Sequence, residues 1–244
     1  MRTSYSALQT FRDCPLRYKA QYIDKMPSAQ SIEALLGVAL HSAFEYMLDP
    51  LTPLPSYHEV EKRFLSIWQS AHVDNGAHER HTIEGIDMVR SFYRRNKEIK
   101  SRVYAVEMSV ILPLGGHVAY GFIDRLDKEV GKESYEIIDY KTGARTFDES
   151  DVKRNLQLGI YALALKKSSP LFPPEKIITT LYATRADQMI SVEPTEEDLV
   201  YVHEEVLKTI QEIEHAIEHT AFTPRKNKYC DQCPLRSRCV LWKT

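Results

Sequence analysis

One short stretch of the chain, GFIDRLDKEVGKESYEIIDYKTG, holds more carboxylates than two adjacent strands usually carry. Asp124 precedes the dipeptide Gly131-Lys132 and Asp139 follows it, and the apolar alternation around them is typical of a β-hairpin. Glycine at the first central position suits a two-residue type II′ turn, which would place Asp124 directly opposite Asp139. Two carboxylates with Cβ atoms about 4.5–5.5 Å apart repel each other unless a cation lies between them. The spacing therefore predicts a site for a hard divalent metal ion.

The same register divides the other charged side chains of the hairpin between two faces. Lys141 shares a face with Asp139, whereas Asp127 and Arg125 lie on the opposite face. Two interpretations of this stretch remain open. Either the acids form a metal site with a lysine beside it, or they form a solvated surface in which Lys141 is a salt-bridge partner. Apolar neighbours such as Phe122 leave little room for a purely solvated face.

The four cysteines are the second group of residues that could do chemistry. Cys14 stands alone near the start of the chain, whereas Cys230, Cys233 and Cys239 cluster near its end. In a reducing compartment disulfides are rare, so metal ligation is the better interpretation. Four thiolates can hold either a zinc ion or a 4Fe–4S cluster, although zinc sites more often consist of two C-x-x-C pairs.

Composition and charge bound the class of protein. The chain has 244 residues, an apolar fraction of 43% and a formal net charge of -2, which suit a globular protein and argue against the wrapping of a polyanion. The first residues contain no apolar signal segment, and the longest apolar run, residues 34–44, is far shorter than the roughly 20 residues of a transmembrane helix. We therefore expect a cytoplasmic protein without membrane contact. The chain contains no Walker loop, and hence no helicase motor of its own.

The elements that must position these residues follow from the spacing of apolar side chains. Helical spacing, with Ser4 or Ser6, Ser150 and Thr195 as N-caps, predicts helices over 4–22, 31–48, 59–70, 82–97, 151–167 and 195–219. Alternation and β-branched residues predict strands over 103–112, 117–128, 134–142, 177–184 and 189–192. We expect one domain over 1–244, with a helical N-terminal part (1–100), an α/β core (101–194) and a helix plus cysteine-bearing tail (195–244).

Five motifs occur in order along nearly the whole chain: SYSAL to CPLRY (4–18), GVALHSAFE (37–45), GFIDRLD (121–127), IDYKTG (138–143) and QLGIYA (157–162). Together they resemble the RecB-like branch of the PD-(D/E)XK nucleases. The form with an iron–sulfur cluster includes the AddB-type nuclease domains and the CRISPR-associated adaptation nucleases. The resemblance implies an α/β fold with a restriction-endonuclease-like mixed sheet flanked by helices.

Site residues carry over from the resemblance position by position. It implies a Mg²⁺ or Mn²⁺ ion bound by His41, Asp124, Asp139 and the backbone carbonyl of Tyr140. Glu107, on the preceding strand, matches more loosely and could also reach the site.

Three further residues complete the catalytic set that the resemblance implies, in addition to the two aspartates. Lys141 matches the lysine of the motif, and Gln157 and Tyr161 match a helical motif beside the site. Their spacing of four residues independently places Gln157 and Tyr161 on one face of a helix. A phosphodiester needs its charge neutralised and a water made nucleophilic, which a divalent ion and a lysine can provide.

The resemblance also implies a structural 4Fe–4S cluster on Cys14, Cys230, Cys233 and Cys239. The expected protein is then a metal-dependent DNA exonuclease of DNA repair that prefers single strands. Its partners would be single-stranded DNA or duplex ends, and a helicase or recombination protein supplied in trans. Two alternatives remain. One is a non-catalytic nucleic-acid-binding subunit with the same fold, and the other is a zinc-stapled protein-interaction module.

Overall fold

The computed structural model describes residues 1–27, 30–70, 75–168, 174–233 and 235–242. Within these ranges the chain forms a six-stranded mixed sheet in which β2 pairs with β3 and the remaining strands follow the order β1-β3-β4-β5-β6. The strands are β1 (Arg2–Ser4), β2 (Val103–Leu114), β3 (His117–Lys128), β4 (Ser134–Lys141), β5 (Lys176–Ala183) and β6 (Gln188–Val192). The mixed sheet with its flanking helices confirms the predicted fold class.

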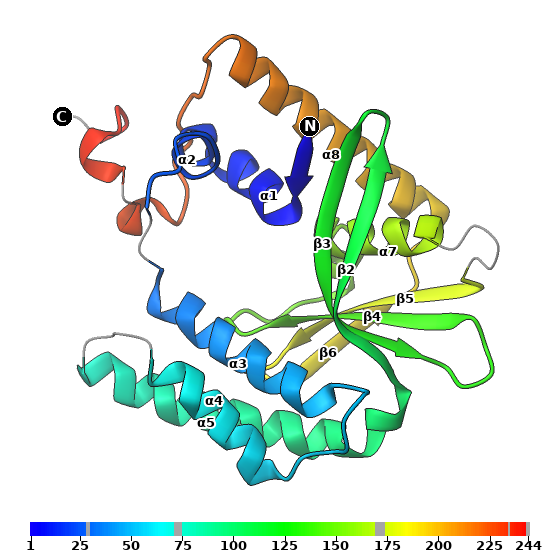
Figure 1. The fold of residues 1–244 in the computed structure, drawn as a ribbon. Helices are drawn as coiled ribbons and strands as arrows, with labels where there is room; N and C mark the ends of the chain where they lie inside the picture. The colour runs from blue at the N-terminus through cyan, green and yellow to red at the C-terminus, as the bar shows by residue number, and fades with distance from the viewer. Residues whose placement is uncertain (28–29, 71–74, 169–173, 234, 243–244) are drawn as a thin grey trace.

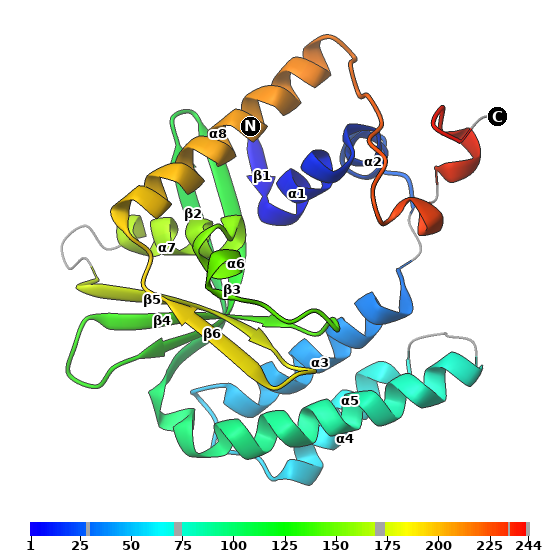
Figure 2. The same ribbon diagram turned by 180° about the vertical axis from the view of Figure 1, so that it is seen from behind.

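Helices cover both faces of this sheet (Figures 1 and 2). They are α1 (Tyr5–Asp13), α2 (Pro15–Tyr18), α3 (Ile32–Leu48), α4 (Tyr57–Trp68), α5 (Asn75–Asn96), α6 (Glu149–Lys153), α7 (Leu156–Ser168) and α8 (Glu196–Glu218). Shorter turns of helix lie at Lys19–Ile23, Lys97–Arg102, Cys230–Gln232 and Arg236–Arg238. Among the described helices, none is both long and apolar enough to cross a bilayer.

Two hydrophobic clusters form on the two faces of the sheet. The first joins α1, α7 and α8 to β2, β3, β4 and β5, and the second joins α3, α4 and α5 to the other side of β4 and β5. Ile137 and Ile138 are consecutive on β4, both are fully buried, and one belongs to each cluster. The central strands are therefore covered on both sides, and the active residues must lie where this cover opens.

The hairpin of β3 and β4 has the predicted register but a different turn. Arg125 pairs with Ile138, as the sequence predicted, yet the strands are closed by the bond from Glu129 N to Ser134 O at 2.9 Å. The two-residue type II′ turn is therefore wrong: four residues connect the strands, and Gly131 adopts a φ of 77°. The register is unchanged because the real loop adds one residue on each side of Gly131-Lys132.

Two predicted helices are interrupted in the structure. The helix expected over 4–22 breaks at Cys14, whose φ of -164° and ψ of 109° are extended. Pro15 causes this break, because a proline disfavours the helical conformation of the residue before it. The helix expected over 151–167 is two helices, and Asp148 rather than Ser150 caps the first. The second begins after Asn155, whose side chain accepts a hydrogen bond from Leu158 N at 3.0 Å.

The remaining predicted elements are confirmed, with one addition. Helices over 31–48, 59–70 and 195–219 are present, and α5 begins at Asn75, before the predicted residue 82. The short strand β1 was not predicted, and it runs parallel to residues 118–120 of β3. On the same edge β4 pairs with β3 only from Arg125 onward, so residues 121–124 lie in a gap between two strands.

Candidate active site

The strands β3 and β4 separate at Asp124, and this fork organises the site. The last recorded pair is Arg125 with Ile138, so the same register would bring Asp124 opposite Asp139. The buried Asp124 Oδ2 instead accepts a hydrogen bond from the Tyr140 amide at 2.7 Å. A buried amide must find an acceptor, and the carboxylate here replaces the backbone carbonyl of a neighbouring strand. The bond fixes the orientation of Asp124.

Glu107 faces Asp124 from β2 in an unusual backbone conformation. Its neighbours on β2 pair with the residues directly before and after Asp124, and its own φ is 46°. Ala105 and Met108 both pack against the first cluster although they are three residues apart, so the alternation of β2 reverses at Glu107. A glutamate with positive φ is a strained residue that the surrounding sheet must hold in place. The reversal brings this side chain to the fork.

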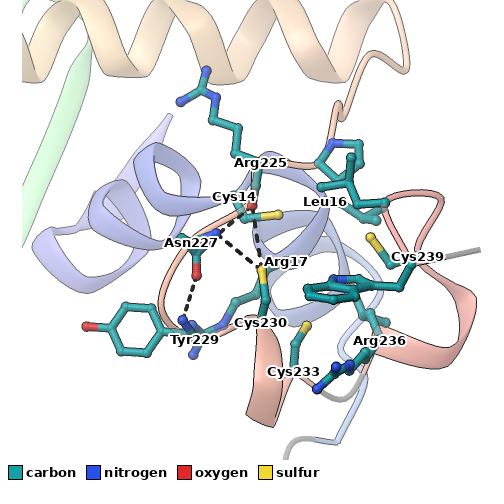
Figure 3. Close-up of a pocket in the computed structure, with 14 residues that line it drawn as sticks. Cys14, Leu16, Arg17, Arg225, Asn227, Tyr229, Cys230, Cys233, Arg236 and Cys239 are labelled. Atoms are coloured by element: carbon teal, nitrogen blue, oxygen red, sulfur yellow. Dashed lines mark hydrogen bonds between the residues drawn. The ribbon is translucent and has the colours of Figure 1, made fainter.

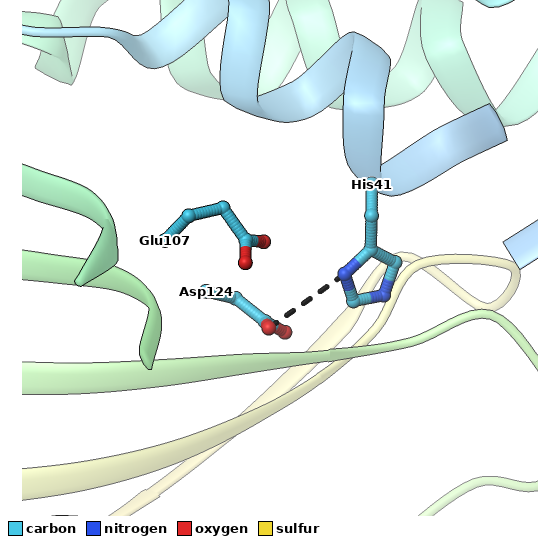
Figure 4. A group of neighbouring side chains, drawn as sticks. All are labelled: His41, Glu107 and Asp124. Carbon is cyan, nitrogen blue, oxygen red and sulfur yellow. Dashed lines mark ion pairs between the residues drawn. The ribbon is translucent and has the colours of Figure 1, made fainter. Parts of the chain in front are cut away.

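The helix α3 completes the group by supplying His41 (Figure 4). Potential ligand atoms of His41, Glu107 and Asp124 all lie within 4.8 Å of one another, and His41 Nδ1 is 3.6 Å from Asp124 Oδ1. The helix lies close to the loop after β4, because a Cβ added at Gly37 would be 3.2 Å from Thr142 Oγ1. A cleft remains between α3 and the sheet, lined by Gly37, His41, Glu45, Glu107 and Asp124, and His41 reaches toward the sheet within it.

The pKa values of this group are all shifted in the direction that disfavours the charged forms. Burial and the charge of Asp139 raise the pKa of Asp124 to about 8. Burial and the charge of Glu45 raise the pKa of Glu107, while burial lowers the pKa of His41 and favours a neutral imidazole. Carboxylates that are costly to ionise and a neutral imidazole form a donor set that a divalent cation would stabilise.

A chain of polar contacts runs from β4 to α7 beside this group. Lys141 Nζ lies 2.6 Å from Asp139 Oδ2 and donates a hydrogen bond to Gln157 Oε1 at 2.9 Å. Gln157 Nε2 in turn donates to Tyr161 Oη at 3.0 Å. Burial opposes the charge of Lys141, but Asp139 outweighs it and the pKa of Lys141 is raised, so the ammonium stays charged at neutral pH.

The sequence of the chain also matches a known family. The sequence model of the PD-(D/E)XK nuclease superfamily matches residues 2–240. The chain belongs to the PD-(D/E)XK nuclease superfamily. A search of curated proteins returns no match.

One solved structure of low sequence identity agrees with this assignment at the level of the fold. A provisionally assigned exonuclease from Eubacterium rectale has a TM-score of 0.60 and 12% identity, over 99% of this chain and 89% of that chain. LHK-Exo in complex with dAMP has a TM-score of 0.30 and 17% identity, over 77% of this chain and 95% of that chain. The second likeness is too weak to support an argument.

The structure brings most of the site residues expected for this PD-(D/E)XK nuclease into one region, with one difference in grouping. Glu107, the loosest match in the sequence, lies in the compact group with His41 and Asp124. Asp139 lies outside that group and pairs with Lys141, although its charge acts on Asp124. Tyr140 lies beside the group, and its ring meets the His41 ring edge-on at 5.7 Å.

Next to Asp124 on β3 lies a buried clamp, part of which the sequence did not reveal. Arg125 and Asp127 pair with each other through Arg125 Nε and Asp127 Oδ1 at 2.6 Å, and neither belongs to the group of His41, Glu107 and Asp124. Arg125 Nη1 also donates to Asn96 Oδ1 at 2.7 Å, and Asn96 Nδ2 donates to Phe92 O at 2.8 Å. The clamp ties β3 to the end of α5. Asn96 carries no sequence signal for this role, because the contact depends on two distant elements meeting.

The four cysteines line one pocket between α2 and the C-terminal segment (Figure 3). The chain brings Cys14 there through the break before α2, and Asn227 Nδ2 holds the C-terminal segment by donating to Asp13 O at 2.9 Å. Among the described residues, no three of the cysteine sulfurs lie within 4.8 Å of one another.

Proposed function

We propose that this PD-(D/E)XK nuclease is a divalent-metal-dependent deoxyribonuclease that hydrolyses phosphodiester bonds. The observation that carries the proposal is the convergence of His41, Glu107 and Asp124 beside the charged Lys141. A solvated hairpin would not explain why Asp124 is buried and Glu107 half-buried, or why the pKa values of both are raised. The buried charge is costly, and its retention indicates a function that needs it.

The donor set fits a hard divalent cation. His41, Asp124 and Glu107 would hold Mg²⁺ or Mn²⁺, and Asp139 and the Tyr140 carbonyl are the further ligands expected in the RecB-like branch. Such an ion supplies charge neutralisation at a phosphate oxygen and lowers the pKa of bound water. The imidazole of His41 softens the oxygen site, so Mn²⁺ should compete well with Mg²⁺.

Lys141 and its partners carry the part of the mechanism that belongs to the chain itself. The Lys141 ammonium lies between Asp139 and Gln157, which restricts its position to the edge of the acidic group. From there it would orient the attacking water or offset the negative charge that develops on the phosphate. Tyr161 donates no charge but fixes Gln157, and therefore acts through Lys141.

We further infer that Cys14, Cys230, Cys233 and Cys239 hold a 4Fe–4S cluster with a structural role. All four cysteine side chains line the same pocket, and four thiolates are the ligand set that such a cluster needs. When bound, the cluster supplies a covalent link between the first helices and the C-terminal segment. Closing such a long loop would restrict the unfolded chain strongly.

The finer assignment rests on the sequence resemblance. It comprises membership of the RecB-like, AddB-like branch, exonuclease action with preference for single strands, and DNA ends as substrate. The exonuclease part gains support from the similarity of the fold to the Eubacterium rectale protein. A cytoplasmic location, a single functional domain and a helicase or recombination partner in trans belong to the same proposal.

One experiment tests the enzymatic proposal directly. Anaerobically purified protein would be incubated with Mn²⁺ or Mg²⁺ and with single- or double-stranded DNA labelled at either end. We expect cleavage by the wild type and none by Lys141→Ala, while Lys132→Ala should cleave normally because Lys132 lies exposed in the β3–β4 turn. Equal melting temperatures would show that Lys141→Ala is folded. Retained cleavage in Lys141→Ala would contradict the mechanism, and a wild type that binds but never cleaves would favour a non-catalytic subunit.

A further inference from the structure

One face of β2 and β3 exposes large apolar side chains next to the candidate active site. Ile111 is 56% exposed and Phe122 is 52% exposed. Tyr120 pairs directly with Ile111, and Phe122 pairs with Ser109, so these side chains are neighbours on the sheet. The other face of the same strands packs on α7 and α8, where Ile123 is fully buried. A sheet with one buried face normally carries polar residues on its outer face, whereas here Ile111 and Phe122 lie exposed beside Ser109.

This apolar strip, defined by Ile111, Tyr120 and Phe122, ends at the acidic group. Phe122 lies two residues before Asp124 on β3, a distance of about 7 Å along the strand. Helix α3 meets the sheet at Asp124 through His41, and no helix lies in front of the upper part of β2 and β3 in the view of Figure 1. The strip therefore lies next to the cleft beneath α3, whose lining includes Asp124.

A positive charge lies at the far end of the strip. Arg2 is exposed on β1, and its guanidinium lies 4.9 Å from the centre of the Tyr120 ring. Along β3 the surface thus presents the guanidinium of Arg2, then the rings of Tyr120 and Phe122, and then the candidate metal ligands. This order suits a polymer that alternates charged phosphates with flat apolar groups.

We propose that the strip stacks the unpaired bases of single-stranded DNA whose phosphate lies at the group of His41, Glu107 and Asp124. The inference rests on the proposed nuclease function and gives a physical origin for strand selectivity. Bases in a duplex are stacked on each other and cannot lie flat on Phe122, whereas every unpaired base presents a face that can. Arg2 contacts a phosphate further along the same strand.

Binding in EDTA tests the strip without cleavage. The probes are a fluorescein-labelled oligothymidine and an oligonucleotide of equal length that lacks bases, compared by fluorescence anisotropy. We expect wild-type protein to bind the oligothymidine about 5- to 150-fold more tightly than the abasic strand, the range expected for stacking of one base. Phe122→Ala should lose about fivefold or more on the oligothymidine and nothing on the abasic strand, and Phe122→Trp should retain affinity.

A matched control separates stacking from general loss of surface. Tyr104 is 54% exposed on the same strand β2, but its ring packs edge-on against Tyr135 at 6.0 Å, away from the strip. Tyr104→Ala should bind both probes like the wild type. Equal affinity of the wild type for the two probes, or an equal loss on both in Phe122→Ala, would overturn the inference.

Cleavage assays distinguish failure of this inference from failure of the proposed function. If the wild type cleaves DNA but shows no difference between the two probes, the strip does not stack bases and the nuclease proposal stands. If the probes differ as expected but no metal supports cleavage, the strip binds single strands and the nuclease proposal fails.

Discussion

Replacing Asp124 by asparagine should stabilise the protein while abolishing its activity. The carboxylate is 9% exposed and lies beside Asp139, and both burial and that charge raise its pKa from 3.8 to about 8. An asparagine side chain keeps an oxygen that can accept the hydrogen bond from Tyr140 N, but it carries no charge. Asp124→Asn therefore removes an electrostatic penalty and keeps the hydrogen bond that links β3 to β4 at this point.

The pKa shift sets the size of the gain. At pH 7, which is about three pH units above the ordinary pKa, Asp124 lowers the free energy of unfolding by about 4 kcal/mol. This figure takes about 1.4 kcal/mol for each pH unit between the ordinary pKa and pH 7. Water that enters the cleft below α3 reduces this cost, so we expect Asp124→Asn to be about 2–4 kcal/mol more stable in EDTA. Urea unfolding followed by the fluorescence of the buried Trp68 would measure the difference.

The stability gain of Asp124→Asn should increase with pH. Because the folded pKa lies above the unfolded pKa, the stability that Asp124 contributes is fully present below about pH 4 and is lost as the pH rises through about 8. The variant lacks this loss. The difference between the variant and the wild type should therefore be near zero at pH 4 and should grow steadily to about pH 8.

Asp127 offers a matched control, because the same change to asparagine should destabilise the protein there. It lies three residues away on the same strand, but it is paired with the buried Arg125. Asp127→Asn should lose about 3–5 kcal/mol, because it leaves a buried guanidinium without its counter-charge. If Asp124→Asn is no more stable than the wild type at pH 7, or if the gain does not change between pH 5 and pH 8, the electrostatic account of the site is wrong.

Three further outcomes follow from the packing and the cysteine pocket. Gly121→Ala should lower the free energy of unfolding by about 1–3 kcal/mol and reduce cleavage, because the new Cβ would lie 2.7 Å from Tyr161 Cε1. Adding Tyr161→Leu to this variant should restore stability, whereas additive losses of the two changes in urea unfolding would argue against the clash. Gly131→Ala should cost about 1 kcal/mol without loss of cleavage, because its φ of 77° is strained for alanine; a larger thermal loss would point to a role beyond the turn. Cys233→Ser should remove a broad absorbance near roughly 400 nm that a 4Fe–4S cluster gives the wild type, and a colourless wild type that contains zinc would refute the cluster.

The sequence predicted the fold where local rules act alone. Alternation placed β3 and β4, and the register of Arg125 with Ile138 was right although the turn was wrong. That success depended on symmetry, because a loop of two residues and a loop of four residues centred on the same dipeptide give the same pairing. The helix boundary at Cys14 was missed because helical spacing of apolar residues outweighed the effect of Pro15 in the prediction.

The site was predictable in its members but not in its arrangement. Parity placed Asp124 apart from Asp127, and the contacts with Arg125 agree. The compact group, however, contains Glu107 in place of Asp139, since a positive φ reverses the alternation of β2 at Glu107. The assembled sheet imposes this backbone strain at Glu107, and no local pattern in the sequence predicts it.

The hydrogen bond between Tyr140 N and Asp124 Oδ2 makes one backbone proton a spectroscopic probe of the site. The amide sits 2.7 Å from the carboxylate whose ionisation changes with the occupant of the cleft. Its ¹⁵N and ¹H chemical shifts should therefore titrate with Asp124, and its exchange with deuterium should slow whenever a cation holds that carboxylate ionised. A single resonance from a strand buried at the centre of the sheet would then read out the occupancy of the site without any substrate.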